Sequence, residues 1–256
     1  MAVSLVGRQS IGLPQGPKRE KQAAADWYRL LETMPSFVTP RLDILPPPQR
    51  ALWMELSTLP PIFTLYGGTA IALRYGHRQS EDFDFFSHSA FDPVTLREQI
   101  PFLADASVLR SESSTLTCRV MREEPVLVSF FGVPRLGQLL EPDIAEHVGV
   151  RIASSIDLAG TKVLAVQRRP EAKDYIDIDT LIANGITLPL ALSAGMAIYG
   201  AAFNPQITLK ALSFYEDGNL ATLPRDVRSR LVRAVAAVDL DHLPSLAPIR
   251  RPAGIA

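Results

Sequence analysis

The sequence of 256 residues contains a single cysteine, Cys118, and only four histidines. One cysteine excludes an intramolecular disulfide and any zinc site that is built from several cysteines. The histidines do not follow a metal-binding spacing such as H-E-x-x-H; they are His77, His88, His147 and His242. We therefore expect no metal centre made of cysteine or histidine.

An excess of charge is also missing, because 26 Lys and Arg residues stand against 27 Asp and Glu residues, a formal net charge of −1. A protein that coats nucleic acid over its whole surface needs a surplus of basic residues, so this class is excluded. A hydrophobic content of 47% and a charged content of 21% exclude collagen-like, coiled-coil and wholly disordered proteins. The balance still allows a locally basic groove opposite a locally acidic site.

No hydrophobic run is long enough to cross a bilayer. The chain carries no charge between Asp179 and Lys210, but the unbroken apolar part, residues 190–203, is 14 residues long, whereas a spanning helix needs about 20. Residues 1–6 are mostly apolar, but Gly7 and Arg8 stop this run before it reaches the length of a signal peptide's hydrophobic segment. We expect a buried helix at 190–203, no membrane partner and a cytoplasmic protein.

The pattern of apolar residues changes near Pro142. Before it, the pattern predicts strands at 62–66, 82–86, 116–121 and 126–131, and helices at 23–33, 49–59, 69–75 and from 92 to about 103. After it, helical spacing recurs at 156–169, 172–184, 190–203, 207–215 and 226–238. The sequence thus predicts an α+β fold with three parts: an N-terminal arm with a short helix (1–40), a mixed core (41–150) and a helical C-terminal domain (151–256).

The segment 65–87, LYGGTAIALRYGHRQSEDFDFFS, carries the candidate chemistry. Asp82 and Asp84 are two residues apart, and side chains at this spacing on a strand point to the same side. Two adjacent carboxylates repel each other unless a cation joins them, and Mg²⁺ or Mn²⁺ prefers such oxygen ligands. Phe83, Phe85 and Phe86 would anchor the strand in the core. The alternative is that both acids are only the solvated face of an edge strand.

Two glycines, Gly67 and Gly68, end the strand before the acids and begin a helix. Free backbone N–H groups at such a turn suit phosphate oxygens. Thr69 adds a hydroxyl at this turn, and Arg74 and Arg78 lie in the connection back toward the acids. Glycines alone often mark only a tight turn, but a phosphate-binding turn followed shortly by an acid pair favours a functional site.

The order G-G-T-A-x-A-L-R-x-G-H-R-x-S-x-D-x-D resembles the first motif of the AbiEii/AbiGii-type nucleotidyltransferases, which are toxins of bacterial toxin–antitoxin systems. Further along, Asp157 to Lys162 resembles the family's D-x-x-x-x-K motif, and Lys173 to Asp177 resembles its [RK]-D-x-x-D motif. Residues 203–215 are similar to its helical tail. The resemblance implies a DNA-polymerase-β-like nucleotidyltransferase core, with a mixed sheet and flanking helices, followed by a helical C-terminal domain.

The resemblance also implies roles for individual residues. The turn and the connection before the acids would bind the nucleotide, through Gly67, Gly68, Thr69, Arg78 and Ser80. Asp82 and Asp84 would be catalytic ligands of Mg²⁺ or Mn²⁺. Lys162 would reach the nucleotide phosphates as a point charge; the alternative is an ordinary lysine of an amphipathic helix.

Asp174 and Asp177 are three residues apart and therefore neighbours on one helix face. The resemblance implies a catalytic acid here, and we assign it to Asp174 and a structural role to Asp177. Alternatively, both are solvated and matched by Lys173 and Arg169. Asp157 follows two serines, so it is expected to be a cap or first-turn acid.

One position departs from the broader fold, in which a third carboxylate often lies on a neighbouring strand. Ser129 takes this position in the strand predicted at 126–131. Three interpretations remain open: Asp174 or the substrate completes the site, the enzyme uses one metal ion, or catalysis is weakened.

The leading hypothesis is a metal-dependent nucleotidyltransferase that moves a nucleoside monophosphate from an NTP to an acceptor. By resemblance, the acceptor is RNA, notably the tRNA 3′ end, and the partner is an antitoxin. The alternative is a nucleotide-binding protein of the same fold with little or no turnover. A D-x-D glycosyltransferase or a phosphatase fits the glycine turn and the later motifs less well. The helix that Pro224, Arg225 and Asp226 open carries arginines, which we interpret as a solvated surface or a nucleic-acid contact: Arg225, Arg228, Arg230 and Arg233.

Overall fold

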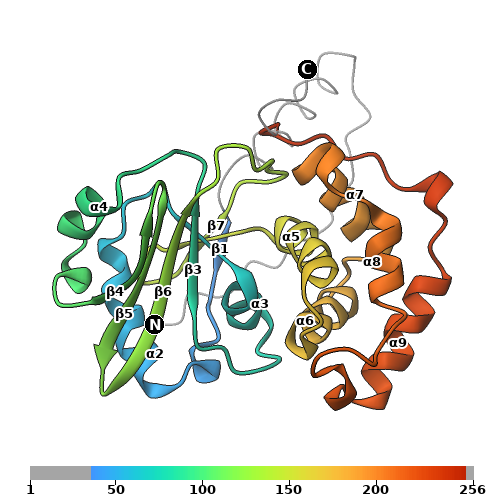
Figure 1. Ribbon diagram of the computed structural model, residues 1–256, viewed down its shortest axis with the longest axis horizontal. Helices are drawn as coiled ribbons and strands as arrows, with labels where there is room; N and C mark the ends of the chain where they lie inside the picture. The colour runs from blue at the N-terminus through green and yellow to red at the C-terminus, as the bar shows by residue number, and fades with distance from the viewer. Residues whose placement is uncertain (1–35, 252–256) are drawn as a thin grey trace, which may run out of the picture. The chain divides into compact units, whose positions relative to one another are not determined.

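The computed structural model describes residues 36–251, and the arm and helix expected before residue 36 lie outside this range. Within it the chain forms one mixed sheet of eight strands in the order β1-β7-β8-β2-β3-β6-β5-β4 (Figure 1). The strands are β1 (Phe37–Val38), β2 (Thr64–Tyr66), β3 (Phe83–Ser87), β4 (Ser107–Glu112), β5 (Thr115–Arg122), β6 (Glu124–Gly132), β7 (Asp143–Ala145) and β8 (Arg151–Ile152). The pairs β1–β7, β2–β8 and β3–β6 are parallel and the other pairs are antiparallel. The predicted mixed sheet is confirmed.

Strand β3 lies in the interior of the sheet, between β2 and β6. Its Phe83 and Phe85 are fully buried on one face, and the Phe85 ring stacks on Phe130 of β6 with centroids 5.4 Å apart. The other face carries Asp84 and Phe86. The alternation of the sequence thus fixes which side of the sheet presents the acid.

The helices of the described residues are α2 (Pro47–Trp53), α3 (Gly67–Tyr75), α4 (Pro93–Gln99), α5 (Ser155–Arg168), α6 (Ala172–Ala183), α7 (Leu188–Tyr199), α8 (Pro205–Ala211) and α9 (Arg225–Ala236). Short 3₁₀ turns accompany them at Leu42–Ile44, Met54–Thr58, Pro101–Leu103, Gly200–Ala202, Leu220–Thr222 and Leu240–His242. The helix expected to run to residue 103 ends at Gln99, because Ile100 precedes Pro101 and adopts an extended conformation. The five helices expected after Pro142 are present as α5 to α9.

Helix α3 packs between the sheet and the helices α5 and α6 (Figure 1). One hydrophobic core connects both halves, from Ile44 near the first strand to Leu231 in α9. Along the chain, the first strand of the sheet is β1 and the last is β8, so the sheet includes residues before and after the range 41–150. The division into three parts stays a prediction.

Helix α7 accounts for most of the uncharged stretch. Its Ala191, Leu192, Ala194 and Gly195 are buried, and it packs against α5, as the prediction of a buried helix requires. In the part of the chain that the structure describes, no single helix is long and apolar enough to span a membrane. Helices α6 and α7, with the turn up to Ala202, reach the length and apolar content of a membrane span only when they are counted together. The chain bends by 114° between them.

Candidate active site

The glycine turn connects β2 to α3 without an intervening loop. Gly67 is the first residue of α3 and has φ +73°, a left-handed value that glycine adopts without strain. A Cβ at this position would lie 3.0 Å from Oδ2 of Asp84, so the turn brings its backbone close to the acid. Tyr66, the N-cap residue, makes no side-chain bond to the first turn. The N–H groups of that turn have no partner within the helix and suit an anion.

Gly68 makes room for Arg78. A Cβ on Gly68 would lie 2.0 Å from Nη2 of Arg78. The guanidinium donates to both carboxylate oxygens of Asp177, from Nε to Oδ1 at 2.7 Å and from Nη2 to Oδ2 at 3.0 Å. Gly68 therefore has a packing role that its sequence pattern did not reveal, beside the predicted role in nucleotide binding.

Thr69 and Ser80 connect the first turn of α3 to the segment that leads into β3. Their hydroxyl oxygens are 2.7 Å apart, and the Thr69 hydroxyl also donates to the backbone carbonyl of Asp82. Both side chains are buried. Thr69 thus holds the backbone of the acid segment in place, while its predicted contact with a nucleotide stays a prediction.

Asp84 lies in β3, whereas Asp82 lies just outside this strand, one residue before its first residue, Phe83. The strand starts later than predicted because β2 ends at Tyr66, which pairs with Asp84 and leaves Asp82 without a strand partner. Asp82 is exposed and Asp84 is partly buried. Because β3 is an interior strand, the interpretation of the two acids as part of an edge strand is wrong.

The acid pair fits a divalent cation. Burial, together with the negative charge of Asp82, raises the pKa of Asp84, and nearby cations only partly oppose this. A cation bound between the carboxylates would relieve the repulsion. Among residues 36–251 no group of three or more His, Cys, Asp or Glu side chains could hold a metal ion. Two carboxylates are nevertheless a sufficient protein contribution for Mg²⁺, which takes its other ligands from water and substrate phosphates.

A buried ion-pair cluster lies behind the acid pair, where α5 packs on α6. Nζ of Lys162 lies 2.8 Å from Oδ1 of Asp174 and 2.9 Å from Oδ2 of Asp177. Lys162 is 5% exposed and both aspartates are fully buried. The two aspartates are therefore not solvated, although Arg169 does pair with Asp174 as that alternative expected, and Lys162 is not an ordinary lysine of an amphipathic helix.

The charges of this cluster hold one another in the ionised form. Burial alone would lower the pKa of Lys162, but Asp177 and Asp174 together raise it. Burial alone would raise the pKa of both aspartates, but Lys162 and the neighbouring arginines hold both values below the usual range. A buried charge network of this kind is stable only when each member has its partner.

Asp177 and Asp174 differ in what surrounds them. Asp177 is enclosed by Lys162, Arg78 and His77, whose Nε2 is 2.7 Å from Oδ1. Asp174 binds Lys162 and also accepts from Nε of Arg169 at 2.7 Å. These contacts agree with a structural role for Asp177.

The predicted site residues meet in one pocket of about 310 Å³. Every predicted site residue except Gly67 lines this pocket. The full lining is Gly68, Thr69, Arg78, Gln79, Ser80, Glu81, Asp82, Asp84, Lys162, Arg169, Lys173 and Asp174. Gln79 and Glu81 are lining residues to which the sequence assigned no role, and Arg169 and Lys173 were considered only as charge partners of the aspartates on α6. Lys173 is the first residue of the [RK]-D-x-x-D motif, whereas the other three lie only beside the motifs.

Two residues near the site have the surroundings that the sequence predicts. Asp157 lies in the first turn of α5, where it accepts from the backbone N–H groups of Leu139 and Leu140 and from the hydroxyl of Ser154. Ser129 on β6 is the register partner of Asp84. The neighbouring strand therefore presents a hydroxyl where a third carboxylate would lie.

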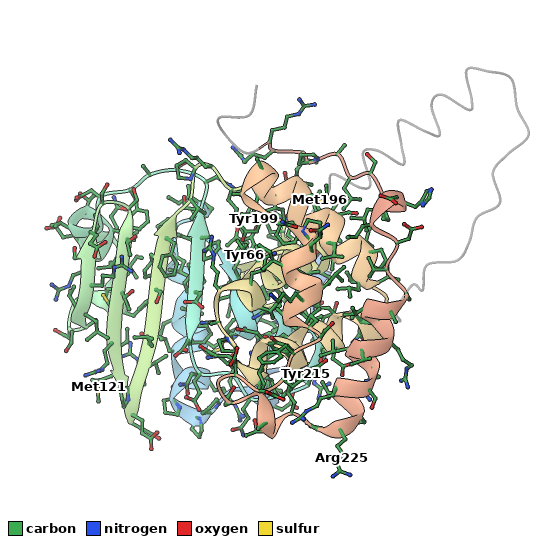
Figure 2. All side chains as sticks on the ribbon, turned by 45° about the vertical axis from the view of Figure 1, so that its right-hand side comes forward. Tyr66, Met121, Met196, Tyr199, Tyr215 and Arg225 are labelled. Carbon is green, nitrogen blue, oxygen red and sulfur yellow. The ribbon has the colours of Figure 1, made fainter. Side chains whose placement is uncertain are left out.

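The arginines of α9 do not form one solvated row. Arg228 donates to the carbonyl oxygens of Leu220 and Ala221 and lies over the ring of Tyr215. Arg230 pairs with Asp179 and Asp226. Arg225 points away from the helix at its N-terminal end (Figure 2), and Arg233 is exposed.

Comparison with known proteins gives three results. The family model described as nucleotidyl transferase AbiEii toxin, type IV toxin–antitoxin system, matches residues 50–241, which are 192 of the 256 residues. An uncharacterized protein of Aquifex aeolicus is 36% identical over 118 residues, 45% of this chain and 55% of that protein, so the chain spans about half the length of this relative. MenT4, a nucleotidyltransferase toxin of Mycobacterium tuberculosis, aligns with a TM-score of 0.51 and 17% identity over 78% of this chain and 84% of MenT4.

The likeness to MenT4 shows a shared fold and confirms the nucleotidyltransferase core that the motifs implied. The family match covers three quarters of the chain and includes all three motifs, from the glycine turn to the ion-pair cluster. The chain belongs to the AbiEii family of nucleotidyltransferase toxins.

Proposed function

We propose that the protein is a metal-dependent enzyme that transfers a nucleoside monophosphate from an NTP to the 3′ end of an RNA and releases pyrophosphate. One observation carries the proposal: the pocket joins an acid pair, Asp82 and Asp84, to a cationic wall. The wall contains Arg78, Lys162, Arg169 and Lys173. A metal ion requires the acids and a triphosphate requires the cations, so this combination suits a metal-bound nucleotide.

Asp82 and Asp84 would hold Mg²⁺ or Mn²⁺, which when bound neutralises the charge that develops on the leaving pyrophosphate. The glycine turn would bind phosphate oxygens through its N–H groups, next to Asp84. Thr69 positions the backbone of Asp82 for this arrangement. The acid pair and the phosphate-binding turn are therefore held by the same few residues.

Asp174 and Lys162 contribute through charge and orientation. Because Lys162 and Arg169 depress the pKa of Asp174, its carboxylate is a weak proton acceptor. The three hydrogen bonds that it accepts instead fix the Lys162 ammonium and the Arg169 guanidinium at the pocket wall. We propose that Asp174 acts by orienting these two cations toward the nucleotide phosphates.

The acceptor and the partner are part of the same proposal. The family is one of toxin–antitoxin systems, which supports a cognate antitoxin as the protein partner. Since NTPs and RNA are both present in the cytoplasm, we propose that the protein acts there. The second candidate function, nucleotide binding with little or no turnover, is favoured by one observation: Ser129 lies beside Asp84 where a carboxylate would complete the acid set.

The test is incubation of the purified protein with Mg²⁺, total RNA and each labelled NTP in turn. We expect labelled RNA with the wild-type protein and none with the double variant Asp82→Asn/Asp84→Asn. Asp105→Asn is the matched control, because Asp105 is an exposed acid that does not line the pocket. Stabilisation by an NTP without labelled product from any NTP would favour the second candidate.

A further inference from the structure

A second cavity of about 480 Å³ adjoins the active-site pocket. It lies between the C-terminal end of α5, the start of α6, helix α8 and the turn that follows it. Its lining includes Arg168, Arg169, Tyr175, Ile207, Lys210 and Phe214. Arg169 lines both cavities. The two spaces therefore meet at this residue, and we name the second one the α5–α8 cavity.

Large apolar side chains are exposed at the α5–α8 cavity. Phe214 is 46% exposed and Ile207 is 47% exposed. Tyr175 is buried beneath them, and its hydroxyl donates to the carbonyl oxygen of Ala211 at 3.1 Å. Exposed aromatic and aliphatic groups beside a cavity indicate a binding surface.

The same cavity is cationic. Arg168, Arg169 and Lys210 line it and are exposed, whereas Asp217 is the acid among its lining residues. Arg169 pairs with Glu171 and Asp174. In the described part of the chain, no ion pair involves Arg168 or Lys210, so both charges can serve an anionic ligand.

Hydrogen bonds hold the walls of the cavity in place. The side-chain amide of Gln167 on α5 donates to the carbonyl oxygen of Asn204 at 2.9 Å and to the hydroxyl of Thr208 at 2.8 Å, which fixes α8. Across the cavity, the backbone N–H of Ala172 donates to Oδ1 of Asn219 at 2.7 Å. The cavity is therefore formed before a ligand binds, which lowers the cost of binding.

We infer that the α5–α8 cavity binds the single-stranded 3′-terminal nucleotides of the RNA acceptor. Phe214 would stack on a base, and Arg168 and Lys210 would bind the adjacent phosphates. An exposed aromatic ring beside free cations is the combination that binds single-stranded nucleic acid, whereas a purely apolar ligand would not need the cations. The RNA would pass Arg169, which lines both spaces, on its way from this cavity to the acid pair. The inference rests on the proposed function.

The experiment measures the two substrates separately, with Phe214→Ala, Lys210→Gln and Arg168→Gln. Phe214→Ala is expected to raise KM for a single-stranded RNA acceptor about tenfold, as loss of one stacked base would, while KM for the NTP stays unchanged. Lys210→Gln and Arg168→Gln should each lower the salt dependence of RNA binding by about one unit of slope. All three side chains are exposed, so a thermal unfolding curve like that of the wild type confirms that the variants fold.

Met121→Ala is the matched control, because Met121 is 54% exposed on β5 (Figure 2), outside the α5–α8 cavity. It should leave both KM values unchanged. An active wild type together with an unchanged RNA KM in Phe214→Ala would overturn the inference. Absence of transfer by the wild type with every NTP would instead contradict the proposed function, so the two failures are distinguishable.

Discussion

Asp84 and Ser129 are register partners on the parallel strands β3 and β6. Side chains of partners in neighbouring strands lie on the same face of a sheet, so Ser129 occupies the position from which a third carboxylate would reach the acid pair. Its side chain is buried, and its hydroxyl accepts a long hydrogen bond from Thr117 at 3.4 Å. The sheet therefore provides a place for the missing acid but fills it with a neutral group.

Ser129→Asp should make the stability of the fold depend on a bound divalent cation. Without divalent cation, a third buried carboxylate beside Asp84 is expected to destabilise the fold by about 1–3 kcal/mol, because like charges in a desolvated cluster repel. Mg²⁺ should recover most of this loss. Thermal unfolding with EDTA and with Mg²⁺ measures both effects. The neutral variant Ser129→Asn is the control; if the two variants respond equally to Mg²⁺, Ser129 does not face the metal site.

Asp84→Asn is expected to stabilise the metal-free protein at neutral pH while it abolishes transfer. The raised pKa of Asp84 means that the folded protein holds this proton more tightly than the unfolded chain does. Stability is therefore lost as pH rises from the ordinary aspartate value near 4 through the raised value. In EDTA the variant should have the higher melting temperature at pH 7, and the difference between the two melting temperatures should vanish toward pH 4. Asp105→Asn, at an exposed acid outside the pocket, is the control, and the same curve for both variants would refute the explanation.

The two aspartates Asp177 and Asp179 on α6 should differ strongly in their contribution to stability. Asp177→Asn removes the partner of Lys162 and Arg78 in a buried cluster, and a loss of about 3–5 kcal/mol is expected. Asp179→Asn should cost about 1 kcal/mol or less, because its partner Arg230 is 41% exposed and keeps a second bond to Asp226. Urea unfolding of both variants provides the comparison. Equal losses would show that Asp177 is not the centre of the cluster.

Gly67→Ala and Gly149→Ala form a matched pair. Both glycines have similar left-handed φ values, +73° and +70°, so each alanine should cost about 1–2 kcal/mol of stability. A Cβ on Gly67 also meets Oδ2 of Asp84 at 3.0 Å, whereas a Cβ on Gly149 meets no atom within 4 Å. We expect both variants to melt at a lower temperature, Gly67→Ala more so because Asp84 must also move, and a weaker response to Mg²⁺ and lower transfer activity in Gly67→Ala alone. Equal activity in the two variants would show that the glycine turn is not part of the active site.

The parts of the fold that follow strong patterns could be predicted from the sequence. The sequence predicts the strands β2, β3, β5 and β6 and the helices after Pro142, and the structure contains them. The strands β1, β7 and β8 have two or three residues each, which is too short for a period to show. Strand β4 has every residue exposed, so its sequence carries no contrast between a buried and a solvated face.

The sequence predicts which residues belong to the candidate site, but not which of them pair with one another. The motifs identified Lys162, Asp174 and Arg78, because their spacing is a property of the sequence. The pairing of Arg78 with Asp177 and of Arg169 with Asp174 depends on how α5 and α6 pack against α3, which no local pattern records. The packing role of Gly68 was missed for the same reason, since the group that needs its space comes from ten residues further along the chain.

The contacts of Asp177 also determine when the site can form during synthesis. His77 and Arg78 lie 100 and 99 residues before the carboxylate that binds them. Because a chain grows and folds from its N-terminal end, a nascent chain that already contains the acid pair lacks the residue that orients Arg78. The site is completed only after α6 has left the ribosome. A polypeptide that is interrupted before this helix would carry the motif of a nucleotidyltransferase toxin without its assembled pocket.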